Sequence, residues 1–200
     1  MNKDMTSIQA QWALASRAPS WLQSMGLAIS ASAFIAVCSH IALPLWFTPV
    51  PLTLQPFAVL LIGLLLAPRT AAGACLAYLA EGAAGLPVFA PATVAVTGVA
   101  HLFGPTGGYL LAYPAAAALI AILIRRGNGS YWAVLASAAV GNLLILASGA
   151  LWLAALTHAT AQHVLSLSVL PFLPGDALKI SAAAALAVAW RRMRRTAHQD

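Results

Sequence analysis

Asp176 and Lys179, two oppositely charged residues, lie three positions apart in an apolar stretch near the C-terminal end of the sequence. At this spacing their side chains share one face of a helix and are close enough to interact. In one interpretation the pair is structural, because the charges neutralise each other and Asp176 caps a helix that begins after Pro174 and Gly175. In the other, the carboxylate accepts and the ammonium group donates hydrogen bonds to a polar group of a ligand. Charges are rare elsewhere in the sequence, and this rarity favours the ligand site.

Two further polar residues, Glu81 and Asn142, lie inside apolar segments. Counting from the nearest cations at ~1.5 Å per residue places Glu81, Asp176 and Lys179 in the outer half of a membrane and Asn142 near its middle. We therefore include Asn142 among the expected ligand-binding residues and leave the role of Glu81 open.

A glycine-rich segment, Gly104-Pro105-Thr106-Gly107-Gly108, stands just before a long apolar run. The free backbone N–H groups of Gly107 and Gly108 at the start of a helix could bind a ligand carboxylate. The segment could equally be a tight turn with Thr106 as the N-cap. Both interpretations stay open at the level of sequence.

Catalytic and metal-binding motifs are absent from the sequence. His101, His158 and His163 have no metal-ligand spacing and are interpreted as surface or packing residues. No Walker loop, nucleophile elbow, metal-ligand cluster or close carboxylate pair is present. We therefore predict no catalytic residue, no metal and no cofactor, and we do not expect this chain to hydrolyse a nucleotide by itself.

The composition predicts a polytopic membrane protein. Hydrophobic residues make up 62% of the chain and charged residues 7%, and the mean hydropathy is +0.87, whereas soluble domains are about 45–50% apolar. Six spans of ~20 residues use about 120 positions, so we predict one integral domain over 1–200, with an extension at 1–23, a bundle at 24–190 and a basic tail at 191–200. The net charge of +6 is assigned to helix ends that face lipid headgroups, not to nucleic-acid binding.

The expected fold is an all-α bundle of six transmembrane helices. They cover about Ser24–Leu43, Leu54–Ala67, Thr70–Leu86, the glycine-rich segment to Ile124, Tyr131–Leu156 and Gly175–Trp190. The second is short, because 14 residues rise only ~21 Å against a hydrocarbon core of ~30 Å. We expect apolar outer loops to complete the span and to close over the site, including the loop with three prolines between Pro49 and Pro56.

The positions of the cations predict the orientation in the membrane. Nine of the ten Lys and Arg residues fall at the N-terminus, in connections two-three and four-five, and in the C-terminal tail: Lys3, Arg17, Arg69, Arg125, Arg126, Arg191, Arg192, Arg194 and Arg195. The other three connections contain none. By the positive-inside rule, both termini are predicted to be cytoplasmic.

Four motifs occur in order along the chain: Pro49-Val50-Pro51-Leu52-Thr53-Leu54-Gln55, Gly85-Leu86-Pro87-Val88-Phe89, Gly104-Pro105-Thr106-Gly107-Gly108-Tyr109 and Pro171-Phe172-Leu173-Pro174-Gly175-Asp176-Ala177-Leu178-Lys179. Together they resemble the BioY family, the biotin-binding S components of energy-coupling factor (ECF) transporters. The resemblance implies a six-helix protein of the bacterial inner membrane that captures biotin from outside. It also implies an ECF T component and ATPase subunits as partners, while a homo-oligomer stays open.

The resemblance assigns site residues. It implies that Asp176 and Lys179 bind the ligand and that the loop around Gln55 is an outer lid. Biotin has an apolar ring system with polar ends, so the pocket should have aromatic walls. The aromatic candidates are Trp46, Phe47, Phe89, Phe103 and Tyr109.

One departure from the family pattern concerns the ligand carboxylate. The family often carries a Gly- and Asn-containing stretch after the Leu-Pro-Val segment, and here Pro91–Gly98 stands in its place. The partner of the carboxylate is therefore open between Thr93, Thr97 and the amides of Gly107 and Gly108.

Small residues on the first helix predict a contact with another helix. Ala28, Ser32 and Ala36 lie on one face, and such faces permit close backbone approach in lipid. With the resemblance supplying the partner, we expect this face to dock the T component.

Two other functions remain as alternatives. An S component for a different vitamin would share the architecture but not the four motifs. A membrane-embedded enzyme would use Glu81, Asp176 and a histidine, and it would convert its ligand instead of binding it unchanged.

Overall fold

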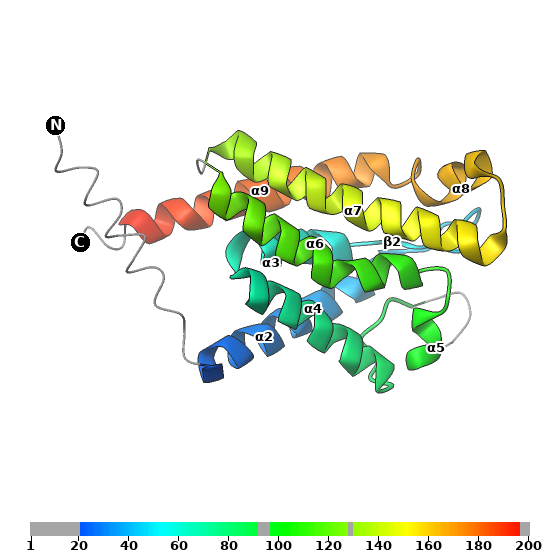
Figure 1. The fold of residues 1–200 in the computed structure, drawn as a ribbon, viewed down its shortest axis with the longest axis horizontal. Helices are drawn as coiled ribbons and strands as arrows, with labels where there is room; N and C mark the ends of the chain where they lie inside the picture. The colour runs from blue at the N-terminus through cyan, green and yellow to red at the C-terminus, as the bar shows by residue number, and fades with distance from the viewer. Residues whose placement is uncertain (1–20, 92–96, 128–129, 197–200) are drawn as a thin grey trace.

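The computed structural model describes residues 21–91, 97–127 and 130–196, which form a helical bundle (Figure 1). The elements in chain order are α2 (Trp21–His40), β1 (Ala42–Leu43), β2 (Leu52–Thr53), α3 (Gln55–Leu65), α4 (Pro68–Ala83), α5 (Val99–Leu102), α6 (Gly107–Arg126), α7 (Tyr131–Thr157), α8 (Ala161–Ser168) and α9 (Leu173–Thr196). Within the described ranges, α2, α6, α7 and α9 are long and apolar enough to cross a membrane. Helices α3 and α4 are shorter, with 11 and 16 residues.

Local sequence explains several helix boundaries. Pro56 and Pro68 stand in the first turns of α3 and α4, where the missing N–H costs nothing because it would have no partner inside the helix. Ser130 caps α7, since its hydroxyl accepts a hydrogen bond of 3.2 Å from the backbone N–H of Ala133. Thr160 caps α8 in the same way.

The six predicted apolar segments correspond in order to α2, α3, α4, α6, α7 and α9, with differences at the ends. The first helix ends at His40 instead of Leu43, because Ala42–Leu43 pairs antiparallel with Leu52–Thr53 in a short hairpin. The all-α prediction therefore missed β1 and β2, as well as the short helices α5 and α8. Two-residue strands and one- to two-turn helices are too short to leave a periodic pattern in sequence.

Two groups of buried residues hold the bundle together. Residues from α2, α3, α4, α6 and α7 form the larger group, with Tyr78 fully buried within it. The smaller group joins α3, α6, α7 and α9, where Ala183, Ala184 and Ala187 present a small-residue face that allows close helix packing. Arg191 adds a hydrogen bond of 2.9 Å from its guanidinium group to the carbonyl of Leu64 at the end of α3.

The face of α2 that we expected to dock a partner lies inside the bundle. Ser32 is fully buried, and its hydroxyl donates a hydrogen bond of 2.6 Å to Glu81 Oε2 on α4. Ala28 and Ala36 pack against the same core. The prediction of a docking face is therefore wrong at these positions, because small residues serve an internal helix contact as well as an external one. The exposed small or β-branched residues of α2 are Gly26, Ile29, Ser30, Ala33 and Val37.

The chain direction separates the two ends of the bundle. Figure 1 shows that α2 begins, α6 ends, α7 begins and α9 ends at one end of the molecule. The hairpin, α5 and α8 lie at the other end. The hairpin, α5, α8 and the loops that join them, which we call the irregular connections, therefore lie at the end of the bundle where α2 ends and α9 begins.

Candidate ligand-binding site

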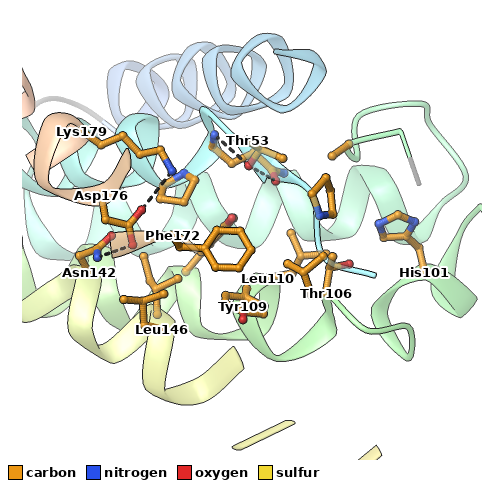
Figure 2. Close-up of a pocket in the computed structure, with 17 residues that line it drawn as sticks. Thr53, His101, Thr106, Tyr109, Leu110, Asn142, Leu146, Phe172, Asp176 and Lys179 are labelled. Carbon is orange, nitrogen blue, oxygen red and sulfur yellow. Dashed lines mark hydrogen bonds and ion pairs between the residues drawn. The ribbon is translucent and has the colours of Figure 1, made fainter. Parts of the chain in front are cut away.

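A cavity lies beneath the irregular connections and is lined by segments that are far apart in sequence (Figure 2). The hairpin loop, α3, α5, α6, α7 and α9 all contribute. Most of the lining is apolar, and the polar side chains are few, as is typical of small-molecule sites. The lining residues are Val50, Pro51, Thr53, Gln55, Pro56, Ala90, His101, Thr106, Tyr109, Leu110, Tyr113, Asn142, Ile145, Leu146, Phe172, Asp176 and Lys179.

One end of this cavity contains a buried polar cluster made of Asp176, Lys179 and Asn142. Lys179 Nζ lies 3.0 Å from Asp176 Oδ1, and Asn142 Nδ2 donates a hydrogen bond of 2.9 Å to Asp176 Oδ2. Their exposed fractions are 4% for Asp176, 8% for Lys179 and 4% for Asn142. The predicted pair is therefore formed, and the structure adds a contact from α7 that holds the second carboxylate oxygen.

The Asn142 side chain can accept a hydrogen bond from a ligand. Its Oδ1 atom is buried and has no hydrogen-bond partner among the described residues. Leaving a buried acceptor unpaired costs about 1–3 kcal/mol, so such an atom in a cavity favours a ligand that supplies an N–H or O–H. The cluster can thus accept hydrogen bonds through Asp176 and Asn142 and donate them through Lys179.

The aromatic part of the lining comes from α6 and from the segment before α9. Tyr109 Oη donates a hydrogen bond of 2.7 Å to the carbonyl of Ser168, and its ring lies beside Phe172 with centroids 6.3 Å apart. Gly149 on α7 makes room for this ring, because a Cβ there would lie 2.2 Å from Tyr109 Cζ. Tyr109 is thus fixed at both its hydroxyl and its ring edge.

Of the aromatic residues expected to form the walls, Tyr109 lines the cavity. Trp46 and Phe103 are 95% and 64% exposed, and Phe47 packs edge-on against Trp46. Phe89 is buried and stacks on His101 behind the lining. The aromatic-wall prediction was therefore wrong for most of its members.

The sequence interpretation missed Tyr113 and Phe172, which supply the remaining aromatic lining. The helical spacing of both residues could have indicated that they face the cavity. Tyr113 follows Tyr109 by four positions, and Phe172 precedes Asp176 by four. Residues at this spacing share a helix face.

Gln55 connects the cavity to the segment that follows α4. Its Nε2 donates to the hydroxyl of Tyr78, which donates a bond of 3.0 Å to the carbonyl of Val88. The same carbonyl accepts a bond of 2.6 Å from the hydroxyl of Ser39 on α2. Gln55, expected in an outer lid, is therefore buried and links α3, α4 and the Val88 segment.

The glycines at the start of α6 have a packing role in the structure. A Cβ at Gly107 would lie 1.9 Å from the carbonyl oxygen of Leu102, and one at Gly108 would lie 2.2 Å from Trp152 Cβ. The N–H of Gly107 already donates a bond of 3.0 Å to Gly104. Both glycines lie outside the cavity lining, so contact between their amides and a ligand stays a prediction.

The remaining predicted residues lie away from the cluster. Thr97 is exposed and outside the lining, and Thr93 lies outside the described residues. Glu81 binds Ser32 between α2 and α4 and is absent from the cavity lining. The structure therefore does not bring Glu81 and Asp176 together as the enzyme alternative required.

Comparison with known proteins matches this architecture to one family. A model of the BioY family matches residues 5–196. A probable biotin transporter BioY of Pyrococcus horikoshii is 40% identical over 139 residues, which cover 70% of this chain and 79% of that protein. Biotin transporter BioY2 of Lactococcus lactis is 37% identical over 158 residues, covering 79% and 84%. Biotin transporter BioY of Thermotoga maritima is 35% identical over 162 residues, covering 81% and 92%.

A solved structure has a similar fold. The crystal structure of the S-component for biotin from an ECF-type ABC transporter superposes with a TM-score of 0.77 and 26% sequence identity. The match covers 86% of this chain and 92% of that chain. These relatives are transport proteins.

Proposed function

Because this chain belongs to the BioY family, we propose that it is the membrane subunit that binds biotin for uptake, energised by an ECF-type module. The observation that carries the proposal is the buried cluster of Asp176, Lys179 and Asn142 in a largely apolar cavity. Biotin has a matching pattern of groups, with a ureido ring that offers two N–H donors and one carbonyl acceptor. Its fused rings and hydrocarbon tail suit an apolar lining.

The hydrogen-bonding capacities of the cluster support one arrangement of the ureido ring. One N–H donates to the Asp176 carboxylate, and the other donates to Oδ1 of Asn142, which is unpaired among the described residues. Lys179 donates to the ureido carbonyl. In this arrangement every buried polar atom of the cluster gains a partner, and the ring faces are left to Tyr109 and Phe172.

The cation positions support a membrane arrangement. We infer six spans with both termini in the cytoplasm, in the bacterial inner membrane, so that the cavity opens to the outside. Helices α3 and α4 are short, and the hairpin and the Val88 segment complete their spans as protein-buried backbone. A T component and ATPase subunits would supply the energy, and a homo-oligomer is compatible with this arrangement.

Equilibrium binding to purified protein tests the function. Titration calorimetry in detergent should give saturable 1:1 binding of biotin, and mass spectrometry should recover the ligand unchanged. Riboflavin and thiamine serve as control vitamins and should give no heat of binding. Tight binding of a control vitamin, or conversion of biotin to a product, would contradict the proposal.

A further inference from the structure

His101 is a buried side chain of the cavity that the polar cluster does not use. It is 7% exposed, it belongs to the short helix α5, and it lines the cavity together with Thr106. Figure 2 shows His101 and Thr106 at the end of the cavity opposite Asp176, Asn142 and Lys179. The cavity therefore has a second polar end.

The imidazole is held in place by its surroundings. Its ring stacks on Phe89 with centroids 4.8 Å apart and an interplanar angle of 21°, and Phe89 in turn packs edge-on against Tyr78 at 5.4 Å. Since Tyr78 accepts from Gln55, the ring is connected to the same framework that lines the cavity. A histidine positioned in this way can donate a hydrogen bond through a ring N–H in either protonation state.

The length of the cavity suits a ligand with two polar ends. Thr106, the N-cap of α6, and Tyr113 on that helix both line the cavity, and the seven residue steps from one to the other correspond to a rise of about 10 Å. The tail of biotin joins its ring system to the carboxylate carbon through five bonds of ~1.5 Å, which extend it by about 6 Å beyond the rings. With the ureido ring at Asp176, the carboxylate then reaches toward the end of the cavity at which His101 lies.

We infer that His101 is the specificity-determining residue that binds the carboxylate of the ligand, with the Thr106 hydroxyl as an additional donor. This inference rests on the proposed binding of biotin. We prefer it to the candidates Thr97, Gly107 and Gly108, which lie outside the cavity lining, while Thr93 lies outside the described residues. A hydrogen bond to an ionised carboxylate is about twice as strong as one between neutral groups, so His101 favours a ligand with an ionised carboxylate over one with a neutral tail.

Comparison of two ligands tests the inference. Affinities for biotin and for biotinamide, whose tail is neutral, are measured by calorimetry for wild type, His101→Phe and His101→Gln. His101→Phe keeps an aromatic ring over Phe89 but removes the N–H donors, so it should weaken biotin binding about tenfold to a hundredfold. Biotinamide binding should weaken several-fold less, because its tail carbonyl loses only a hydrogen bond between neutral groups. His101→Gln keeps a donor and should restore part of the affinity for biotin.

His163→Gln is the matched control, because this exposed histidine lies outside the cavity lining and should bind both ligands as wild type does. An equal loss of affinity for both ligands in His101→Phe, or no loss for biotin, would overturn the inference. If His101→Phe does not fold, equal affinities of wild type for biotin and biotinamide would overturn it as well. Failure of wild type to bind biotin would instead contradict the proposed function.

Discussion

Asn142 on α7 and Asp176 on α9 are joined by a hydrogen bond of 2.9 Å between Nδ2 and Oδ2, with Lys179 on the other carboxylate oxygen at 3.0 Å. The contact fixes the carboxylate at both oxygens before any ligand arrives. It also orients the Asn142 amide so that Oδ1 is left without a partner among the described residues. Preorganisation of this kind reduces the ordering cost of binding.

Replacing both charged residues distinguishes a ligand site from a structural ion pair. If the pair only neutralises charge, removing one partner should destabilise the protein by about 3–5 kcal/mol and removing both should be nearly neutral. We expect the double variant Asp176→Asn, Lys179→Met to fold but to bind biotin at least a hundredfold more weakly, since two charge-assisted hydrogen bonds of about 1.5–3 kcal/mol each are lost. Calorimetry measures the affinity and a thermal melt in detergent controls for folding. A stable double variant with wild-type affinity would show that the pair is structural.

Removing the unpaired acceptor tests the role of Asn142 separately. Asn142→Leu keeps a similar volume but loses both the bond to Asp176 and the Oδ1 acceptor. We expect biotin affinity to fall by about tenfold or more, because a buried ureido N–H would be left without a partner at a cost of about 1–3 kcal/mol. Leu146→Met, which conserves volume in the lining, should change affinity much less. Equal effects of the two substitutions would argue against a hydrogen bond from Asn142.

The pairing of Asp176 with Lys179 was predictable from the sequence, whereas the contact with Asn142 and the position of His101 in the cavity were not. Asp176 and Lys179 stand out because charges are rare and their spacing places them on one helix face. The contact with Asn142 depends on how α7 and α9 pack, which the spacing within one helix does not determine. His101 was interpreted as a surface or packing residue, because its position in the cavity is set by α5 and by stacking on Phe89.

Helix positions were predicted better than helix faces. Long apolar runs locate α2, α6, α7 and α9 from composition alone. The inward face of α2 was not predictable, because Ser32 and Ala33 are both small and only packing against α4 decides which of them is buried. The exposure of Trp46 has the same origin, since an apolar loop does not specify which aromatic side chain turns inward.

A methyl group at Gly149 should displace Tyr109. The Cβ of Gly149→Ala would lie 2.2 Å from the Tyr109 ring, so the ring must move and lose its bond to Ser168. We expect a lower melting temperature and weaker biotin binding, since overpacking costs about 1–3 kcal/mol. Gly73→Ala is the matched control, because nothing lies within 4 Å of its Cβ and alanine favours a helix by about 1 kcal/mol over glycine. Wild-type binding by Gly149→Ala would show that the position of Tyr109 does not matter.

The proposed topology predicts the accessibility of two connections. Single cysteines are introduced as Asn128→Cys and His163→Cys in a background in which Cys38 and Cys75 are replaced by alanine. An impermeant thiol reagent added to intact cells should label the cysteine at position 163 and not the one at position 128, because the positive-inside rule assigns the connection after Arg125 and Arg126 to the cytoplasm. Permeabilised cells provide the control, in which both should react. The reverse labelling pattern would overturn the orientation.

Adjacent residues of α2 should respond in opposite ways to the same substitution. Ser32 is fully buried and bonded to Glu81, whereas the neighbouring Ala33 is exposed. Ser32→Trp must insert a large ring between α2 and α4, at a cost of about 1–3 kcal/mol for overpacking, and it removes a hydrogen bond to a charged group worth about 1.5–3 kcal/mol. Ala33→Trp adds the same ring on the outside and should leave both the melting temperature and biotin affinity in detergent close to wild type. If the energising partner docks on the exposed face of α2, Ala33→Trp will nevertheless reduce uptake by cells that contain the complete transporter, whereas normal uptake would place the docking surface on another helix.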